Sequence, residues 1–396
     1  YGRFQDREED LFENGFEEKS LKNLTAKVSV TPSKDHDLVL EASQVDQRRR
    51  SLVGYSAQAT GCRGGCTDSD NRSSREAFSL SHTGRWAIGT SDTYVQRERA
   101  ENENREMVIT NTTAKSSLVM PLGNHRVTMG ADFIEEALSD KTSNRISDLT
   151  RIDTAKYALF AEDEWMLTDT FSLTAGARMD DDDNFGSHFS PRLYGVWGFS
   201  PRWTLKGGVS TGFRSPSLRE ITPDWGQVSR GGNVYGNPDL EPETSLNKEI
   251  ALLYGNDAGL NGSLTLFHND FEDKIPRIAC PIDICNAGPN QFGSDPTYRV
   301  NIDDAVTQGV EASLGAPLTD TLALTASYTF TDSEQKSGEY AGEPQRETLL
   351  PQQGVAAVVG AEAHDQVFIG EVADVALFGV EVSCAGHPLH KAALLT

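Results

Sequence analysis

The chain has 396 residues, 37% of them hydrophobic, and 36 Lys and Arg against 59 Asp and Glu give a formal net charge of −23. This balance argues against a nucleic-acid-binding surface, because phosphate groups would be repelled. The sequence contains no run of about 18 apolar residues, so no transmembrane helix is predicted, whereas a barrel of alternating apolar and polar residues is not excluded.

Alternation of apolar and polar residues with a period of two predicts β-strands along most of the chain. The clearest apolar faces are, in chain order, Leu24, Ala26, Val28 and Val30; Val127, Met129, Ala131 and Phe133; Phe171, Leu173, Ala175, Ala177 and Met179; Trp203, Leu205 and Val209; and Leu322, Leu324, Ala326, Tyr328 and Phe330. Segment 155–166 is noisier, with Phe160 on its polar face and Asp163 on its apolar face. About fourteen such segments have the length of strands that cross a bilayer.

Connections between these strands alternate between short and long. Tight turns are expected at 31–36, 83–85, 121–124, 168–169, 200–201, 256–259 and 317–320, and long polar connections at 48–75, 97–106, 139–154, 180–188, 212–245, 271–299 and from 332 onward. Such a meander places all tight turns on one rim, whereas the crossings of a soluble sandwich would disturb the alternation. We therefore predict an all-β fold, an antiparallel transmembrane β-barrel with long extracellular loops and short periplasmic turns.

Four of the five cysteines form close pairs in predicted loops. Cys62 and Cys66 lie in GCRGGC, and Cys280 and Cys285 lie in CPIDIC. Metal-binding clusters usually have tighter spacing and add histidine, so we predict two loop disulfides and an oxidising compartment in preference to a metal site. Cys384 is left without a partner in this scheme.

Signatures of enzymes and of dedicated metal sites are missing from the sequence. It contains no GxSxG, HExxH or GxxxxGK motif, and its eight histidines are scattered. The acidic run 180–183 lacks the spaced ligands of a calcium loop, and we interpret it as a solvated loop. We predict no catalytic residues, no metal site and no intrinsic cofactor.

Three motifs follow one another in a fixed order: SPRL at 190–193, GFRSPSLRE at 212–220 and GNPDLEPETS at 236–245. With these motifs, the chain over roughly residues 1–350 resembles the TonB-dependent outer-membrane receptors, particularly the branch that contains the ferric enterobactin and colicin I receptors. Such motifs occur in receptors for different ligands, so we interpret their residues as structural: Ser190, Pro191, Arg192, Gly212, Phe213, Arg214, Pro216, Asn237, Pro238, Leu240, Pro242 and Glu243. In the third motif, the two prolines would stiffen a loop that returns to the barrel, and Leu240 would anchor it.

The resemblance implies a barrel in a bacterial outer membrane, of the 22-stranded class whose lumen is filled by an amino-terminal plug. The implied partners are a ferric siderophore, the TonB protein acting through the plug, outer-membrane lipid, and colicins or phages, with no role for nucleic acid. Neither a plug nor a TonB box is recognisable in the chain, and the strands number about fourteen, so we expect a partial barrel.

Residues 351–396 depart from the family pattern. The alternation breaks down within 354–396, and the chain ends on Thr396 instead of the aromatic residue that the resemblance implies. We interpret 1–350 as the receptor barrel and 351–396 as an atypical tail, frameshifted or unrelated in sequence. A genuine but divergent end is the alternative.

Ferric catecholate complexes are large, aromatic and anionic, so a receptor for them needs guanidinium groups and aromatic rings at its outer mouth. The candidate ligand-binding residues in the long loops are Arg48, Arg49, Arg50, Tyr55, Arg219, Trp225, Arg230 and Tyr235. For the three consecutive arginines, ordinary charges on the rim remain the alternative. We hypothesise a receptor for a ferric siderophore of the catecholate type; a passive porin-like barrel or adhesin, or a non-functional receptor fragment, are the alternatives.

Overall fold

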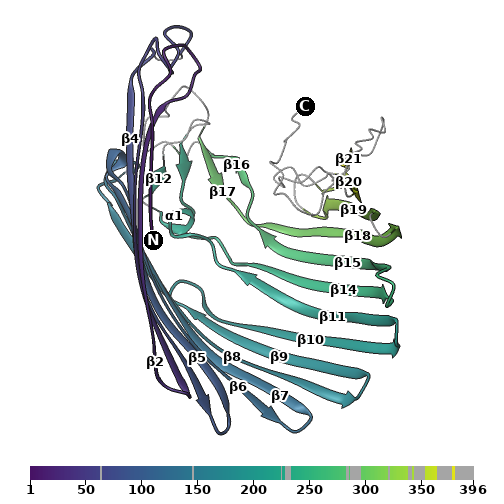
Figure 1. The fold of residues 1–396 in the computed structure, drawn as a ribbon. Helices are drawn as coiled ribbons and strands as arrows, with labels where there is room; N and C mark the ends of the chain where they lie inside the picture. The colour runs from purple at the N-terminus through teal and green to yellow at the C-terminus, as the bar shows by residue number, and fades with distance from the viewer. Residues whose placement is uncertain are drawn as a thin grey trace.

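Most of the described residues lie in one large curved sheet. The computed structural model describes residues 1–62, 65–144, 147–223, 225–227, 233–281, 285, 296–319, 322–337, 341–342, 353–363 and 377–379. Within them, 17 strands form one sheet, and neighbouring strands are antiparallel except for the last pair. The sheet curves around an open interior (Figure 1). No helix of the described residues combines the length and the apolar character needed to cross a membrane.

The strands of the large sheet follow the chain order. They are β1 (Gly2–Arg7), β2 (Glu18–Ser33), β3 (His36–Ser51), β4 (Ser69–Trp86), β5 (Gly89–Asn102), β6 (Met107–Leu122), β7 (His125–Asp140), β8 (Arg151–Thr168), β9 (Phe171–Asp182), β10 (Gly186–Ser200), β11 (Trp203–Arg214), β14 (Glu243–Gly255), β15 (Asn261–Lys274), β18 (Ile302–Thr319), β19 (Leu322–Gln335), β20 (Gln353–Ala363) and β21 (Leu377–Gly379). A 3₁₀ turn, η1 (Glu103–Arg105), joins β5 to β6.

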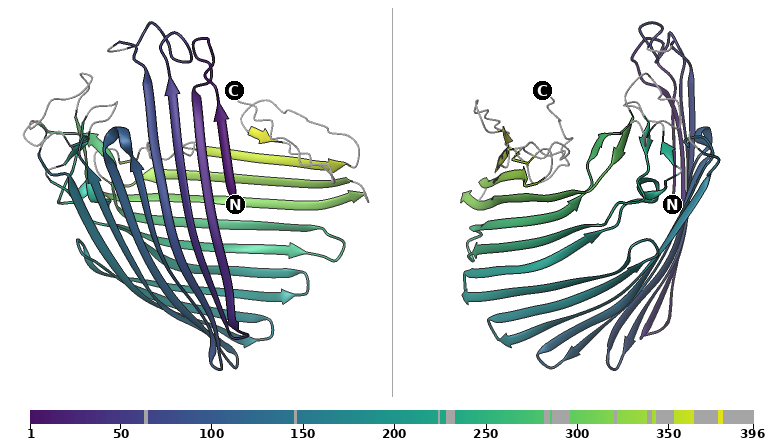
Figure 2. Two further views of the ribbon diagram at one scale, coloured as in Figure 1. Left: turned by 60° about the vertical axis from the view of Figure 1, so that its left-hand side comes forward. Right: turned by 180° about the vertical axis from the view of Figure 1, so that it is seen from behind.

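The fourteen strands predicted from the alternation are confirmed as β2–β11, β14, β15, β18 and β19, and the sheet adds β1, β20 and β21. Short turns gather on one rim and the longer connections on the other (Figure 2). β20 pairs with β19 although it lies beyond residue 350, while most of the expected tail falls outside the described residues. The domain boundary at 350 therefore stays a prediction.

The two faces of the sheet differ in chemistry, as a membrane barrel requires. On the outer, convex face, Met129, Leu159, Met179, Leu193 and Val209 are between 43% and 66% exposed. The inner, concave face is the one over which α1 (Leu218–Ile221) lies (Figure 1), and its side chains include the ion pairs Arg178–Asp132, Arg178–Asp180 and Arg192–Glu162. In this middle part of the sheet, these apolar side chains thus face outward and these ion pairs face inward.

Several element boundaries differ from the sequence prediction. The turn expected at 83–85 is part of β4, which continues to Trp86, and the long connections expected at 97–106 and 180–188 shrink to 103–106 and 183–185. The acidic run is not a solvated loop, because Asp180 and Asp182 belong to β9. Their carboxylates pair on the inner face with Arg178 and Lys156, at 2.9 and 3.3 Å, and these cations allow the strand to continue through the run.

The two residues that broke the alternation in segment 155–166 have local partners. The Phe160 ring lies on the inner face against Gly130, and the Lys115 ammonium lies 5.2 Å from its centroid. Asp163 lies on the outer face near the short-turn rim, where its carboxylate is 2.8 Å from Nδ1 of His125. Each side chain that breaks the pattern is tolerated because neighbouring strands supply a suitable contact: Gly130 and Lys115 for Phe160, and His125 for Asp163.

Replacing Gly130 with alanine should destabilise the barrel. An added Cβ would lie 2.4 Å from the Ser116 carbonyl oxygen and 2.5 Å from the Phe160 ring. We expect a loss of about 1–3 kcal/mol, seen as a lower thermal unfolding temperature of the intact membrane protein in detergent. Gly255→Ala is the matched control, since its Cβ would meet nothing within 4 Å. Equal unfolding temperatures for the two variants would contradict the packing described here.

Candidate functional site

Two long outer connections fold together above the sheet and form the candidate site. The connection 215–242 carries β12 (Gly226–Gln227) and β13 (Val234–Tyr235), and the connection 275–301 carries β16 (Arg277–Ala279) and β17 (Thr297–Arg299). These four strands make a separate small sheet in which β13 and β17 are parallel. The two connections, 215–242 and 275–301, therefore form one structural unit at the outer mouth, which we call the loop unit.

The GNPDLEPE motif joins these two connections. The Asn237 side-chain amide donates to the Arg299 carbonyl at 2.9 Å. Farther along, the Glu241 amide donates to the Asn301 side-chain oxygen at 2.8 Å, and the Asn301 side chain donates back to the Glu241 carbonyl at 2.9 Å. Leu240 is only 3% exposed. Polar groups of the motif are thus hydrogen-bonded within the protein, and its interpretation as structural stays a prediction.

The GFRSPSLRE motif fixes the base of the same unit. The Arg214 guanidinium lies 2.6 Å from the Glu243 carboxylate, whose second oxygen accepts the Ile275 amide at 2.9 Å. Glu220 pairs with Arg299 at 2.7 Å and also accepts the Ser217 amide at the start of α1. Each carboxylate connects two segments that are distant in the sequence.

A polar latch holds the connection 215–242 to the inner face. The Lys156 ammonium donates to the Ser215 hydroxyl at 2.8 Å, and that hydroxyl donates to the Asp182 carboxylate at 2.8 Å. The Asp182 side chain is 4% exposed. The sequence does not predict this latch, because Lys156 of β8 and Asp182 of β9 become neighbours only through the strand register. The acidic run is the one signal in the sequence, and its composition predicts a loop instead.

A second attachment buries a charged pair. Arg219 donates to Asp140 at 2.8 Å, and the Asp140 side chain is fully buried. The other oxygen of Asp140 accepts the amides of Thr142 and Ser143. Burial lowers the pKa of Arg219, and the charge of Asp140 opposes this effect. Because a buried charge is costly without its partner, this pair fixes α1 against the end of β7.

Two aromatic residues predicted to contact the ligand, Trp225 and Tyr235, are buried inside this unit. The Trp225 ring is fully buried 5.9 Å from the Arg219 guanidinium, and Tyr235 is 4% exposed. β12 and β13 bring them together, because Gly226 pairs with Tyr235. Arg230 lies outside the described residues. The structure thus unites three of the four predicted residues, packed in the interior of the unit, and their contact with a ligand stays a prediction.

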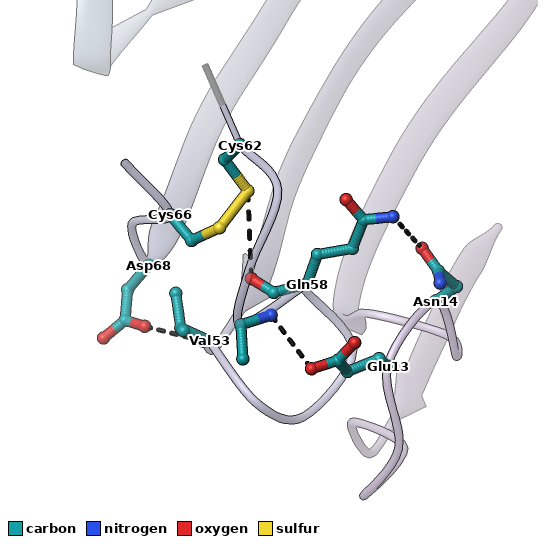
Figure 3. Close-up of a disulfide and its surroundings, with 8 residues drawn as sticks. Glu13, Asn14, Val53, Gln58, Cys62, Cys66 and Asp68 are labelled. Carbon is teal, nitrogen blue, oxygen red and sulfur yellow. Dashed lines mark hydrogen bonds between the residues drawn. A yellow bond between two sulfur atoms is a disulfide. The ribbon is translucent and has the colours of Figure 1, made fainter. Parts of the chain in front are cut away.

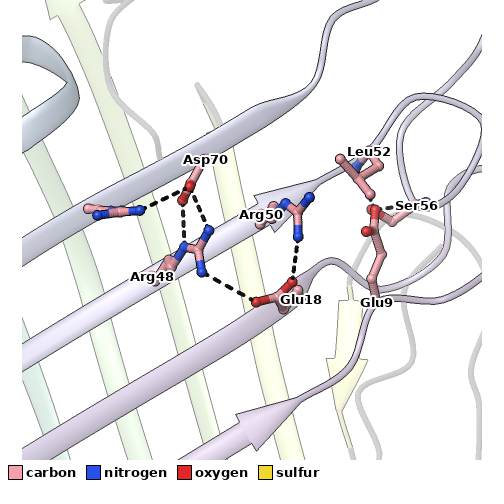
Figure 4. A network of polar contacts seen from close by, with 8 residues as sticks. Glu9, Glu18, Arg48, Arg50, Leu52, Ser56 and Asp70 are labelled. Atoms are coloured by element: carbon pink, nitrogen blue, oxygen red, sulfur yellow. Dashed lines mark hydrogen bonds and ion pairs between the residues drawn. The ribbon is translucent and has the colours of Figure 1, made fainter.

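The three consecutive arginines at the end of β3 all have carboxylate partners, and Figure 4 shows those of Arg48 and Arg50. Arg48 makes a two-pronged contact with Asp70, at 2.8 and 2.7 Å, and Arg50 lies 3.5 Å from Glu18. The register places Arg48 and Arg50 on the outer face, in line with Leu38 and Leu40, and Arg49 on the inner face. Arg49 pairs with Glu17 at 3.3 Å. Of the three, only Arg49 faces the interior.

Tyr55 lies in the connection between β3 and β4, which packs against the β1–β2 connection. Glu9 accepts the Leu52 amide at 2.5 Å and the Ser56 hydroxyl at 2.7 Å. Burial raises the pKa of Glu9, but these hydrogen bonds and the charge of Arg50 outweigh it, so the net pKa is lowered. Tyr55 remains 44% exposed. Its ring is therefore available at the surface of the mouth.

Both close cysteine pairs are disulfides in the structure. Cys62 bonds to Cys66 in the β3–β4 connection, beside residues that contact the β1–β2 connection (Figure 3), and Cys280 bonds to Cys285 after β16. Within the described ranges, no group of three or more His, Cys, Asp or Glu side chains is arranged to hold a metal ion.

Comparison with known proteins identifies the family to which this architecture belongs. A family model described as TonB dependent receptor-like, beta-barrel matches residues 15–359. The chain is similar to the iron-regulated outer membrane virulence protein of Vibrio cholerae, with 56% identity over 345 residues, 87% of this chain and 53% of that protein. It is 30% identical to the ferric enterobactin receptor of Pseudomonas aeruginosa over 66% of this chain and 41% of the receptor.

Solved structures agree with these similarities. A mutant of the ferric enterobactin receptor PfeA of Pseudomonas aeruginosa superposes with a TM-score of 0.69 at 26% identity, covering 81% of this chain and 52% of the receptor. The siderophore receptor PirA of Acinetobacter baumannii gives a TM-score of 0.70 at 21% identity, which shows the shared fold. The chain thus spans about half the length of the curated relatives it matches first.

Removing the buried carboxylate should release α1 from the sheet. In Asp140→Asn, the Arg219 charge loses its compensation, and we expect a local cost of about 3–5 kcal/mol. Hydrogen exchange of residues 217–226 in the intact protein should then accelerate strongly. Lys141→Ala is the neighbouring control, because its pair with Glu106 is exposed and worth about 1 kcal/mol or less. Unchanged exchange in Asp140→Asn would show that the pair does not hold α1.

Proposed function

We propose, from the premise that this chain belongs to the TonB-dependent receptor β-barrel family, that the protein containing it is an outer-membrane receptor for TonB-dependent uptake of a ferric siderophore. The family is one of receptors, not enzymes, so the activity would consist of binding and energised transport. The observation that carries the proposal is the family match over residues 15–359, together with the folded loop unit above the inner face.

The catecholate class is the more specific part of this proposal. Two features support it: relatives at 30% and 29% identity are named as receptors for ferric enterobactin, and the mouth carries the guanidinium and aromatic groups that an anionic, aromatic complex would contact. Among those groups, Arg49 faces the interior and Tyr55 is exposed. We propose these two residues as ligand contacts, and Arg219, Trp225 and Tyr235 as contacts that need the loop unit to open.

The other proposed partners are TonB and, on the extracellular side, a colicin or a phage. TonB would act through a plug domain of the whole protein, by the family resemblance. A colicin or a phage would meet the same outer connections, since these project farthest from the membrane.

Ligand binding by the intact receptor tests the proposal. We expect saturable binding of ferric enterobactin and binding of the hydroxamate ferrichrome that is at least about 100-fold weaker, a difference of about 2.7 kcal/mol. Equal affinities would remove the catecholate assignment, and absence of binding to both would remove the siderophore proposal. Intrinsic protein fluorescence provides the titration signal.

Neighbouring arginines give a matched pair of variants. Arg49→Ala should weaken ferric enterobactin binding about tenfold, because it removes an inward-facing cation. Arg48→Ala should leave the affinity within about twofold, because its guanidinium lies on the outer face with Asp70. The reverse order of effects would contradict the assignment of the two faces at the mouth.

A further inference from the structure

Two histidines and a tryptophan meet on the outer face at the short-turn rim, far along the strands from the loop unit. His36 is the first residue of β3, and His82 lies in β4 opposite Leu38. Gly84 lies opposite His36, and the Trp86 ring occupies the space beside this glycine, where a Cβ would lie 2.8 Å from the indole. The strand register therefore brings all three rings to one patch.

The two imidazoles face each other through nitrogen atoms. Nδ1 of His36 and Nε2 of His82 are 3.0 Å apart, and the rings are stacked with centroids 5.3 Å apart. In the part of the chain that the structure describes, neither ring is hydrogen-bonded to a carboxylate. His125 and His268 differ in this respect, because each contacts an aspartate within 2.9 Å. The His36–His82 pair is thus not explained as an ion pair.

The nitrogen separation suits two ligands of one metal ion. Imidazole nitrogens bind Zn²⁺ at about 2.0–2.1 Å, which places two ligand atoms about 3.3 Å apart in a tetrahedral site. In a square-planar site of Cu²⁺ or Ni²⁺ the same two atoms would be about 2.9 Å apart. The observed 3.0 Å lies between these values. Both rings are half-buried, so water can complete the coordination.

We propose that His36 and His82 form a binding site for a divalent transition-metal ion of the class that prefers imidazole, such as Ni²⁺, Cu²⁺ or Zn²⁺. Both rings bind the ion as neutral imidazoles, so the proton shared by the two nitrogens leaves for solvent, and the ring that carried it takes up a proton from solvent on its other nitrogen. Because β3 and β4 belong to adjacent hairpins, β2–β3 and β4–β5, the ion connects two short turns on the same rim. This site is independent of siderophore binding.

Trp86 provides the signal for a test. Its ring centroid lies 5.0 Å from that of His36 and 6.5 Å from that of His82, close enough for a paramagnetic ion to quench its fluorescence. The intact receptor, purified without a histidine tag, is titrated with Ni²⁺ in detergent, and EDTA is then added. We expect saturable quenching that EDTA reverses, and calorimetry should give about one equivalent per chain.

Four variants decide the assignment. His36→Gln and His82→Gln should each weaken Ni²⁺ binding at least about tenfold. His125→Gln, at the same rim and stacked on Trp165, should bind as the unchanged protein does. Trp86→Phe should lose the fluorescence change but keep the calorimetric binding. Non-saturable quenching in the unchanged protein, or His82→Gln binding Ni²⁺ with unchanged affinity, would overturn the proposal.

Discussion

The pairing of backbone hydrogen-bonding groups between neighbouring strands is the constraint on which the whole structure depends. Lipid offers no partner to an amide or carbonyl group, so each strand must satisfy its groups through its neighbours. The long antiparallel pairings, such as the 16 residue pairs of β6 with β7, meet this requirement. Because side chains alternate with a period of two, the same register also decides which residues face lipid and which face the interior.

The register also explains how the outer connections are held. Asp140 and Asp182 end their strands on the inner face, where they meet Arg219, Ser215 and Lys156. A shift by one residue would move both carboxylates to the outer face and remove both attachments. The loop unit is therefore positioned by the sheet, while its internal order comes from the motif contacts. At the opposite rim, the same register brings His36 to His82.

The sequence alone predicts the strands well, because the alternation is repeated many times and neighbouring segments agree with one another. Boundaries are less certain, since a charged strand end and a polar loop have the same composition; the acidic run at Asp180 shows this. Because side chains alternate along a strand, the sequence implies that Arg48 and Arg49 lie on opposite faces of the sheet. Their salt bridges with Asp70 and Glu17, however, depend on the register between strands. Burial of Trp225 could not be predicted, because it accompanies a pairing of short loop segments, Gly226 with Tyr235, that no alternation in the sequence indicates.

The assignment of the two faces is the central claim, and spin-label accessibility along β8 tests it most directly. Single labels at positions 157–162 of the intact receptor in lipid bilayers would be compared for collisions with oxygen, which concentrates in lipid. The account predicts high accessibility at Tyr157, Leu159 and Ala161 and low accessibility at Ala158, Phe160 and Glu162. Uniform accessibility along the strand, or alternation with the opposite phase, would contradict it.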